Sequence, residues 1–195
     1  MKKNSRIVIA GENTMEGKAF IRLLKEKNYN NIINLDNGEP DLTNFSLLED
    51  FFNNTCPEYV FHVAGKSGGI RSNQKQPATL MLDNLFVICN IISLAHKHKA
   101  KKLLYLASSC TYPKHAEQPM CPDMLMTGAL EPTNSAYATA KLAGIELCRA
   151  FRREYGDNFI SVIPANVFGP GDDFSAKNSH VVAALMIRMH EAKLN

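Results

Sequence analysis

The chain has 195 residues, of which 45% are hydrophobic and 21% are charged. These values are those of an ordinary folded domain, so they exclude intrinsic disorder, a collagen-like fibre and a coiled coil. The 22 basic and 19 acidic side chains leave a formal net charge of +3, too small a surplus to predict a nucleic-acid-binding surface. No uninterrupted apolar run reaches the roughly 18 residues of a membrane span. We therefore expect neither nucleic acid nor a membrane as a partner.

Five cysteines are spread through the chain without a close pair such as C-x-x-C. An odd number without pairing predicts neither a disulfide framework nor a zinc site, and it favours a reducing compartment. The basic N-terminal segment 1–6 is followed by an apolar run of only residues 7–10, which is too short for a secretory signal peptide. A cytoplasmic protein without a bound metal is expected.

Short β-rich runs alternate with longer segments of helical periodicity, which is typical of βαβ units. The predicted strands are near-continuous apolar runs, as buried parallel strands are. They span residues 6–10, 31–35, 59–64, 102–107 and 159–164. The predicted helices span residues 15–27, 82–99 and 135–155. The expected fold class is therefore α/β, a Rossmann-type doubly wound parallel sheet with helices on both faces.

The first predicted strand leads through a Gly-Glu-Asn-Thr-Met-Glu-Gly segment into the first helix, where a dinucleotide pyrophosphate would lie against helix N–H groups. Gly11 suits the tight turn and Gly17 suits close packing of the helix on the strand. Thr14, however, stands where the pattern G-x-x-G-x-x-G has its middle glycine. Glu12 and Glu16 add negative charge beside the expected anion site. Taken alone, the segment is equally consistent with an ordinary strand-to-helix turn.

A carboxylate marks the end of the second predicted strand. Asp36 lies 19 residues beyond Gly17. A carboxylate there accepts hydrogen bonds from a ribose 2′-hydroxyl and repels a 2′-phosphate. Asp36 therefore favours NAD over NADP.

Tyr137 and Lys141, at i and i+4, share one face of the third predicted helix. An ammonium beside a phenol lowers the pKa of the tyrosine, which then exchanges a proton with a sugar or alcohol oxygen near neutral pH. Ser108 follows the fourth predicted strand, at the edge where open parallel sheets place ligands, and its hydroxyl suits the same oxygen. The alternative is a serine-rich turn beside an ordinary surface helix, which Thr133 and Asn134 would cap.

Five sequence blocks occur in order with these residues: KSGGI at 66–70, SSCTYPK at 108–114, LEPTN at 130–134, PANVFGP at 164–170 and NSHV at 178–181. With them, residues 6–193 resemble the extended short-chain dehydrogenase/reductases and, within these, the GDP-L-fucose synthase family. The resemblance implies an NAD(P)-dependent oxidoreductase and epimerase. Its reaction would convert GDP-4-keto-6-deoxymannose to GDP-L-fucose by epimerisation at carbons 3 and 5 and hydride reduction at carbon 4.

The resemblance implies a catalytic role for five residues. Ser108, Tyr137 and Lys141 would form the reductase triad, with Tyr137 as the proton donor. Cys110 and His180 would be the acid/base pair that inverts the two carbons flanking the ketone. This chemistry is reasonable because protons α to a ketone are acidic enough for a side chain of near-neutral pKa to remove.

The resemblance also implies two sets of binding residues. The cofactor would contact Gly11, Thr14, Met15, Gly17, Asp36, Asp41, Leu42, Ala64, Lys141, Asn166, Val167 and His180. The GDP-sugar substrate would contact Ser109, Asn166 and Arg188. NADP(H) is the cofactor of most family members, while Asp36 keeps NAD(H) open. A homodimer through the predicted helices 82–99 and 135–155 is the family expectation.

The chain departs from the family in three ways. The family carries basic side chains near the adenosine 2′-phosphate of NADPH, whereas this chain has Asn13 in the glycine loop and Asp36 after the second predicted strand. Thr14 and Glu16 replace a glycine and an apolar residue of the cofactor loop. Family members also continue into a substrate lobe of about 100 residues.

We therefore expect residues 1–170 to form the dinucleotide-binding domain and residues 171–195 to begin a truncated substrate-binding region. The hypotheses are a working enzyme, a non-catalytic or cofactor-impaired binding or regulatory relative, and an epimerase or dehydratase for another nucleotide sugar.

Overall fold

The protein is described here by a computed structural model that covers residues 1–33, 40–175 and 179–194. Its centre is a parallel sheet with the strand order β1-β2-β3-β4. The strands are β1 (Ile7–Ala10), β2 (Tyr59–His62), β3 (Lys102–Leu106) and β4 (Phe159–Val162). The helices are α1 (Met15–Glu26), α2 (Phe45–Thr55), α3 (Ile70–Lys75), α4 (Pro77–Lys97), α5 (Ser135–Tyr155) and α6 (Val181–Leu194), with the short 3₁₀ helices η1 (Ser109–Thr111) and η2 (Pro122–Met124).

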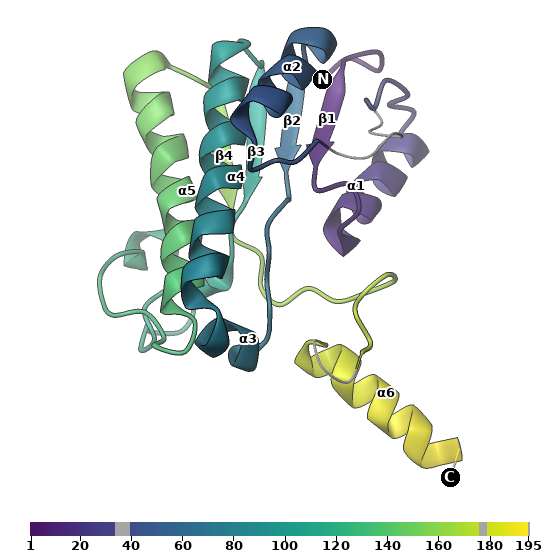
Figure 1. Ribbon diagram of the computed structural model, residues 1–195, viewed down its shortest axis with the longest axis vertical. Coiled ribbons are helices and arrows are strands. Elements are labelled where there is room, and N and C mark those ends of the chain that lie inside the picture. The colour runs from purple at the N-terminus through teal and green to yellow at the C-terminus, as the bar shows by residue number, and fades with distance from the viewer. Residues whose placement is uncertain (34–39, 176–178, 195) are drawn as a thin grey trace.

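Helices cover both faces of this sheet, with α4 and α5 side by side on one face and α1 on the other (Figure 1). Because side chains alternate along a strand, Ile7 and Ile9 face Leu24 of α1, whereas Ala10 belongs to the larger cluster on the opposite face. The predicted Rossmann-type α/β fold is thus confirmed.

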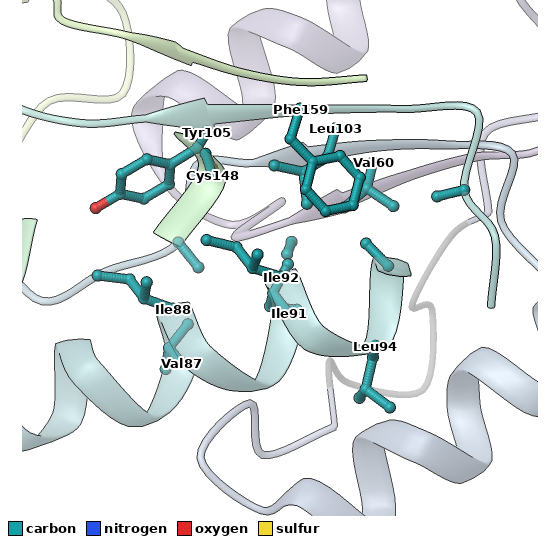
Figure 2. Close-up of a cluster of buried hydrophobic side chains, with 14 of the residues drawn as sticks. Val60, Val87, Ile88, Ile91, Ile92, Leu94, Leu103, Tyr105, Cys148 and Phe159 are labelled. Atoms are coloured by element: carbon teal, nitrogen blue, oxygen red, sulfur yellow. The ribbon is translucent and has the colours of Figure 1, made fainter. Parts of the chain in front are cut away.

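The large core lies between the sheet and α4. Figure 2 shows Ile88, Ile91 and Ile92 of α4 facing Leu103 and Phe159 of the sheet, and these five side chains are almost fully buried. By length and composition α4 would also be able to cross a membrane, but half of its most apolar window is buried within the protein, as in a core helix.

Most predicted elements are confirmed, with small shifts at their ends. The strand predicted at 31–35 is described only in part, since Ile32 forms an isolated parallel bridge with Ile7 and residues 34–39, including Asp36, lie outside the described residues. Helix α5 has the predicted bounds and ends at Gly156, whose φ of 74° lies in the left-handed region. Helix α4 begins five residues before the predicted start, with Pro77 in its first turn.

Gly17 provides a test of the β1–α1 turn. A Cβ atom at this residue would lie 2.1 Å from the backbone oxygen of Gly11, which cannot move without opening the turn. We expect Gly17→Ala to lower the free energy of unfolding by at least about 2 kcal/mol, measured by urea denaturation. Gly169→Ala is the matched control, because nothing lies within 4 Å of the Cβ it would add. Equal effects of the two substitutions would contradict this packing.

Candidate active site

The turn after β1 places the start of α1 at the carboxyl edge of the sheet. Gly11 has a φ of +95°, and a Cβ there would lie 2.6 Å from the Ala64 nitrogen at the end of β2. The Thr14 hydroxyl donates to the Gly11 oxygen at 2.8 Å and accepts from the Gly17 amide at 3.0 Å. Thr14 is thus the N-cap of α1 and closes the turn internally.

A second group of polar side chains follows β3. The Ser108 hydroxyl accepts a hydrogen bond from the Cys110 amide at 3.3 Å, and the Thr111 hydroxyl donates to the Ser108 carbonyl at 2.7 Å. These bonds form η1, which contacts α5. The serine and the cysteine are therefore held on one short turn facing the helix that carries Tyr137.

Tyr137 lies largely within the protein, and burial raises its pKa to about 12. A hydrogen bond with the Ser108 hydroxyl acts in the opposite direction, while Cys110 and Glu16 raise the pKa further. The predicted lowering of this pKa by Lys141 is wrong. The physical reason is that burial of the phenol outweighs the favourable contacts, and that the ammonium of Lys141 is bonded elsewhere.

Lys141 is 4% exposed, and its Nζ donates to the Leu106 carbonyl oxygen at the end of β3, at 3.2 Å. The same Nζ lies 5.4 Å from the centroid of the Tyr105 ring. Burial lowers the pKa of Lys141 to about 8, and Glu16 acts in the opposite direction. The lysine is therefore a buried cation that contacts Leu106 and Tyr105 of β3 and whose charged form is stabilised by Glu16 of α1.

Asn134 has a different role from the one predicted. It occupies the N-cap position of α5, but its side chain makes no capping bond there. Instead, its Nδ2 donates to the Cys110 Sγ at 3.2 Å. Asn134, Tyr137 and Lys141 follow one another at spacings of three and four residues, so they share a helix face. This spacing was the signal in the sequence that could have placed Asn134 in the site.

The structure does not bring His180 and Arg188 to this group. His180 directly precedes α6 and Arg188 lies on it, and α6 stands apart from the sheet (Figure 1). Both side chains are exposed. Within the described part of the chain, no hydrogen bond or ion pair joins His180 to Cys110. The carboxyl of Asp173, whose pKa is lowered mainly by bonds from Ser175, also responds to the charge of His180.

The remaining predicted residues lie on other turns and helix starts. The Asp41 carboxylate accepts from the Thr43 hydroxyl at 2.7 Å and the Thr43 amide at 2.9 Å, which lowers its pKa, and the Leu42 carbonyl accepts from the Asn90 side chain. Met15 begins α1, Ser109 begins η1, and Asn166 and Val167 are exposed beyond β4.

Taken together, a glycine turn after β1 and a Ser-Tyr-Lys set at the edge of β3 and α5 are features of a dinucleotide-binding domain of the Rossmann class. The chain belongs to the NAD dependent epimerase/dehydratase family, whose sequence profile matches residues 7–195.

Curated relatives and solved structures agree with this assignment. The chain is 45% identical over 193 residues to GDP-L-fucose synthase 1 of Arabidopsis thaliana, and 43% identical over 187 residues to GDP-L-fucose synthase of Escherichia coli. These alignments cover 99% and 96% of this chain but 60% and 58% of the relatives. GDP-mannoheptose C4 reductase of Campylobacter jejuni with NADP bound has a TM-score of 0.92 at 34% identity, covering 100% of this chain and 57% of that chain. The chain thus spans about three fifths of the relatives' length.

The buried charge of Lys141 predicts a pH-dependent stability. Between its folded pKa of about 8 and the ordinary value of 10.5, Lys141 binds fewer protons in the folded than in the unfolded chain. Its contribution to the free energy of unfolding therefore rises with pH across this window, by about 3 kcal/mol in all.

We expect the difference in unfolding free energy between the parent and Lys141→Met to change by this amount, measured by urea denaturation across the window. Lys18→Met is the control, because Lys18 is an exposed lysine of α1. A difference between parent and Lys141→Met that stays flat with pH would show that the ammonium is not buried in solution.

Proposed function

We propose that this chain carries the cofactor-binding and catalytic part of an NADP(H)-dependent epimerase/reductase that converts GDP-4-keto-6-deoxymannose to GDP-L-fucose. The observation that carries the proposal is the group at the carboxyl edge of the sheet, where Ser108 and Cys110 on one turn meet Asn134 and Tyr137 of α5. The similarity to GDP-L-fucose synthases over nearly the whole chain supports the same substrate. A non-catalytic relative is not favoured by these comparisons.

In the reduction, Tyr137 acts as the proton donor. Its raised pKa of about 12 keeps the phenol protonated at neutral pH, as a donor requires. The Ser108 hydroxyl, which interacts with that phenol, hydrogen-bonds to the same substrate oxygen and orients it. The bound cofactor supplies the hydride that reaches carbon 4. Lys141 would hold the ribose hydroxyls of the cofactor.

In the epimerisation, Cys110 would remove a proton from one face of a carbon beside the ketone, and a second acid on the opposite face would deliver a proton there, which inverts the carbon. The Asn134 amide donates to the Cys110 sulfur, so the side chain is held in one orientation. His180 is the proposed second acid/base residue, and Arg188 the proposed contact of the substrate diphosphate. Both require α6 to lie closer to Cys110 in the complex with substrate.

The turn after β1 fits a dinucleotide. The close approach of Gly11 to Ala64 leaves the start of α1 facing the edge of the sheet, where its N-terminus favours a diphosphate. Thr14 caps this helix, so its hydroxyl stays within the turn. NADP(H) is favoured because NADP is bound in the similar C4 reductase. Asp36 still allows NAD(H).

The proposal extends to assembly and location. Leu82 and Phe86, one turn apart on α4, are 51% and 52% exposed, and this apolar surface supports a homodimer through α4 and α5. Sedimentation velocity of the full chain measures that state. Five free cysteines support a cytoplasmic location, which imaging of a tagged chain would test.

A second substrate is favoured by one specific observation. The similar structure with a TM-score of 0.92 is a GDP-mannoheptose C4 reductase, so a GDP-linked 4-keto heptose is the alternative. It differs from the 6-deoxy sugar beyond carbon 5 and would use the same Ser108, Tyr137 and Lys141.

An assay with both keto sugars and both cofactors tests the proposed function. We expect oxidation of NADPH, followed at its absorbance maximum, only when a keto sugar is present, fastest with GDP-4-keto-6-deoxymannose and slower with the heptose or with NADH as cofactor. Tyr137→Phe is the matched control for background oxidation. Faster turnover of the heptose would transfer the assignment to the second substrate, and no turnover of either sugar would contradict the proposal.

The two half-reactions are expected to separate by mutation. Tyr137→Phe removes the proton donor and should slow reduction about 10²–10⁴-fold, while exchange of substrate protons with deuterated solvent continues. Cys110→Ser and His180→Asn should impair that exchange, measured by NMR at carbons 3 and 5. Unchanged exchange at both carbons in Cys110→Ser would show that the cysteine is not the base.

A further inference from the structure

Tyr105 of β3 contacts Lys141 in two ways. Its hydroxyl donates to the backbone carbonyl of Lys141 at 3.2 Å, and its ring centroid lies 5.4 Å from the lysine Nζ. Tyr105 is 0% exposed, and burial raises its pKa, so the phenol stays protonated and remains a donor. Figure 2 shows the ring at one end of the large core, with the hydroxyl pointing away from Leu103 and Phe159.

The backbone of α5 lies directly against this ring. A Cβ at Gly144 would be 2.6 Å from ring carbons of Tyr105 and 2.7 Å from its hydroxyl oxygen. Gly144 and Lys141 are three residues apart, so the ring and hydroxyl together contact one turn of the helix. This turn cannot shift along β3 without losing the hydrogen bond or colliding with the ring.

Charged and titratable groups reach Lys141 from several elements. Glu16 acts from α1, and Tyr137 lies one turn before it on α5. His62 of β2 stacks near Tyr105, with centroids 5.2 Å apart, and its pKa is lowered to about 3 by burial and then by Lys141, so its ring is neutral. Helix α4 contributes the uncharged amide of Asn84, which lies with Lys141 Nζ beside Gly65.

We propose that Tyr105 is a positioning residue for Lys141: its ring holds the ammonium beside the Leu106 carbonyl, and its hydroxyl fixes the turn of α5 that carries the lysine. An ammonium over an aromatic face is attracted by the ring electrons, and the attraction is largest where water is excluded, as at this buried pair. The inference concerns the chain without ligands. Only its consequence for catalysis rests on the proposed function.

The test follows the ionisation of Lys141 through the stability of the full chain. Urea unfolding is measured from about pH 6 to 9.5 for the parent and for Tyr105→Leu, each with and without Lys141→Met. In the parent, the pH slope of the part that depends on Lys141 should rise to half of its maximum near pH 8, the folded pKa, and this pH is the midpoint compared among the variants. In Tyr105→Leu this midpoint should move down by about one pH unit, because the ammonium loses the ring.

Three further variants make the test specific. Tyr105→Phe keeps the ring and should keep the midpoint while losing stability through the missing hydroxyl bond. Phe159→Leu removes another buried aromatic ring of the same core, which should lower stability without moving the midpoint. Tyr105→Met removes the ring but supplies a longer, flexible side chain that fills an irregular gap more easily, and it should reproduce the downward shift where Tyr105→Leu does not fold.

Two outcomes would overturn the proposal: an unmoved midpoint in Tyr105→Leu and Tyr105→Met, or an equal shift in Tyr105→Phe and Phe159→Leu. If the chain reduces a keto sugar, the alkaline limb of kcat should shift with the same sign in Tyr105→Leu. The stability measurement needs neither cofactor nor substrate. A failure of the proposed function would therefore leave this result intact, and the two failures are distinguishable.

Discussion

The buried ammonium of Lys141 is the constraint around which the carboxyl edge of the sheet is arranged. The protein acceptor that the described residues place within hydrogen-bond distance of it is the Leu106 carbonyl oxygen. Removing a charge from water is costly unless other groups compensate. Here Tyr105 offers its ring and Glu16 its negative charge, and burial still lowers the lysine pKa to about 8. Strand β3 and helices α1 and α5 are thereby linked through one side chain.

The position of Lys141 also decides how Tyr137 acts. Since the ammonium is bonded to the end of β3, the pKa of the phenol is set chiefly by burial, with Ser108 as the opposing contact. A protonated phenol is the form that donates a proton to a carbonyl oxygen as it is reduced. The phenolate that the sequence predicted would instead suit removal of a proton from an alcohol. A protonated Tyr137 is therefore consistent with the proposed reduction of a ketone.

The sequence predicted most of what local patterns determine. Apolar runs located the four strands, and helical periodicity located α5 to the residue. Helix α2 was missed because its apolar residues lie in a segment rich in Asn and Thr, whose helix propensity is low. Its helical structure is stabilised by packing on α4, which the local sequence does not reveal.

In the site, Tyr137 was predictable from its spacing to Lys141, and Ser108 from its place after a strand. The bond from Asn134 to Cys110 and the contact of Tyr105 with Lys141 join segments distant in sequence, so no local pattern encodes them.

The two departures in the glycine turn have a common physical effect. Thr14 replaces a glycine, yet its hydroxyl satisfies the Gly17 amide and so fixes where α1 begins. That beginning places Glu16 in the first turn of α1, where a carboxylate is favoured by the helix dipole. From there Glu16 stabilises the charged form of Lys141, which burial opposes, and it raises the pKa of Tyr137. Both effects favour the protonated forms of Tyr137 and Lys141. Thr14 therefore fixes the start of α1, and Glu16 contributes to the charge around Lys141 and Tyr137.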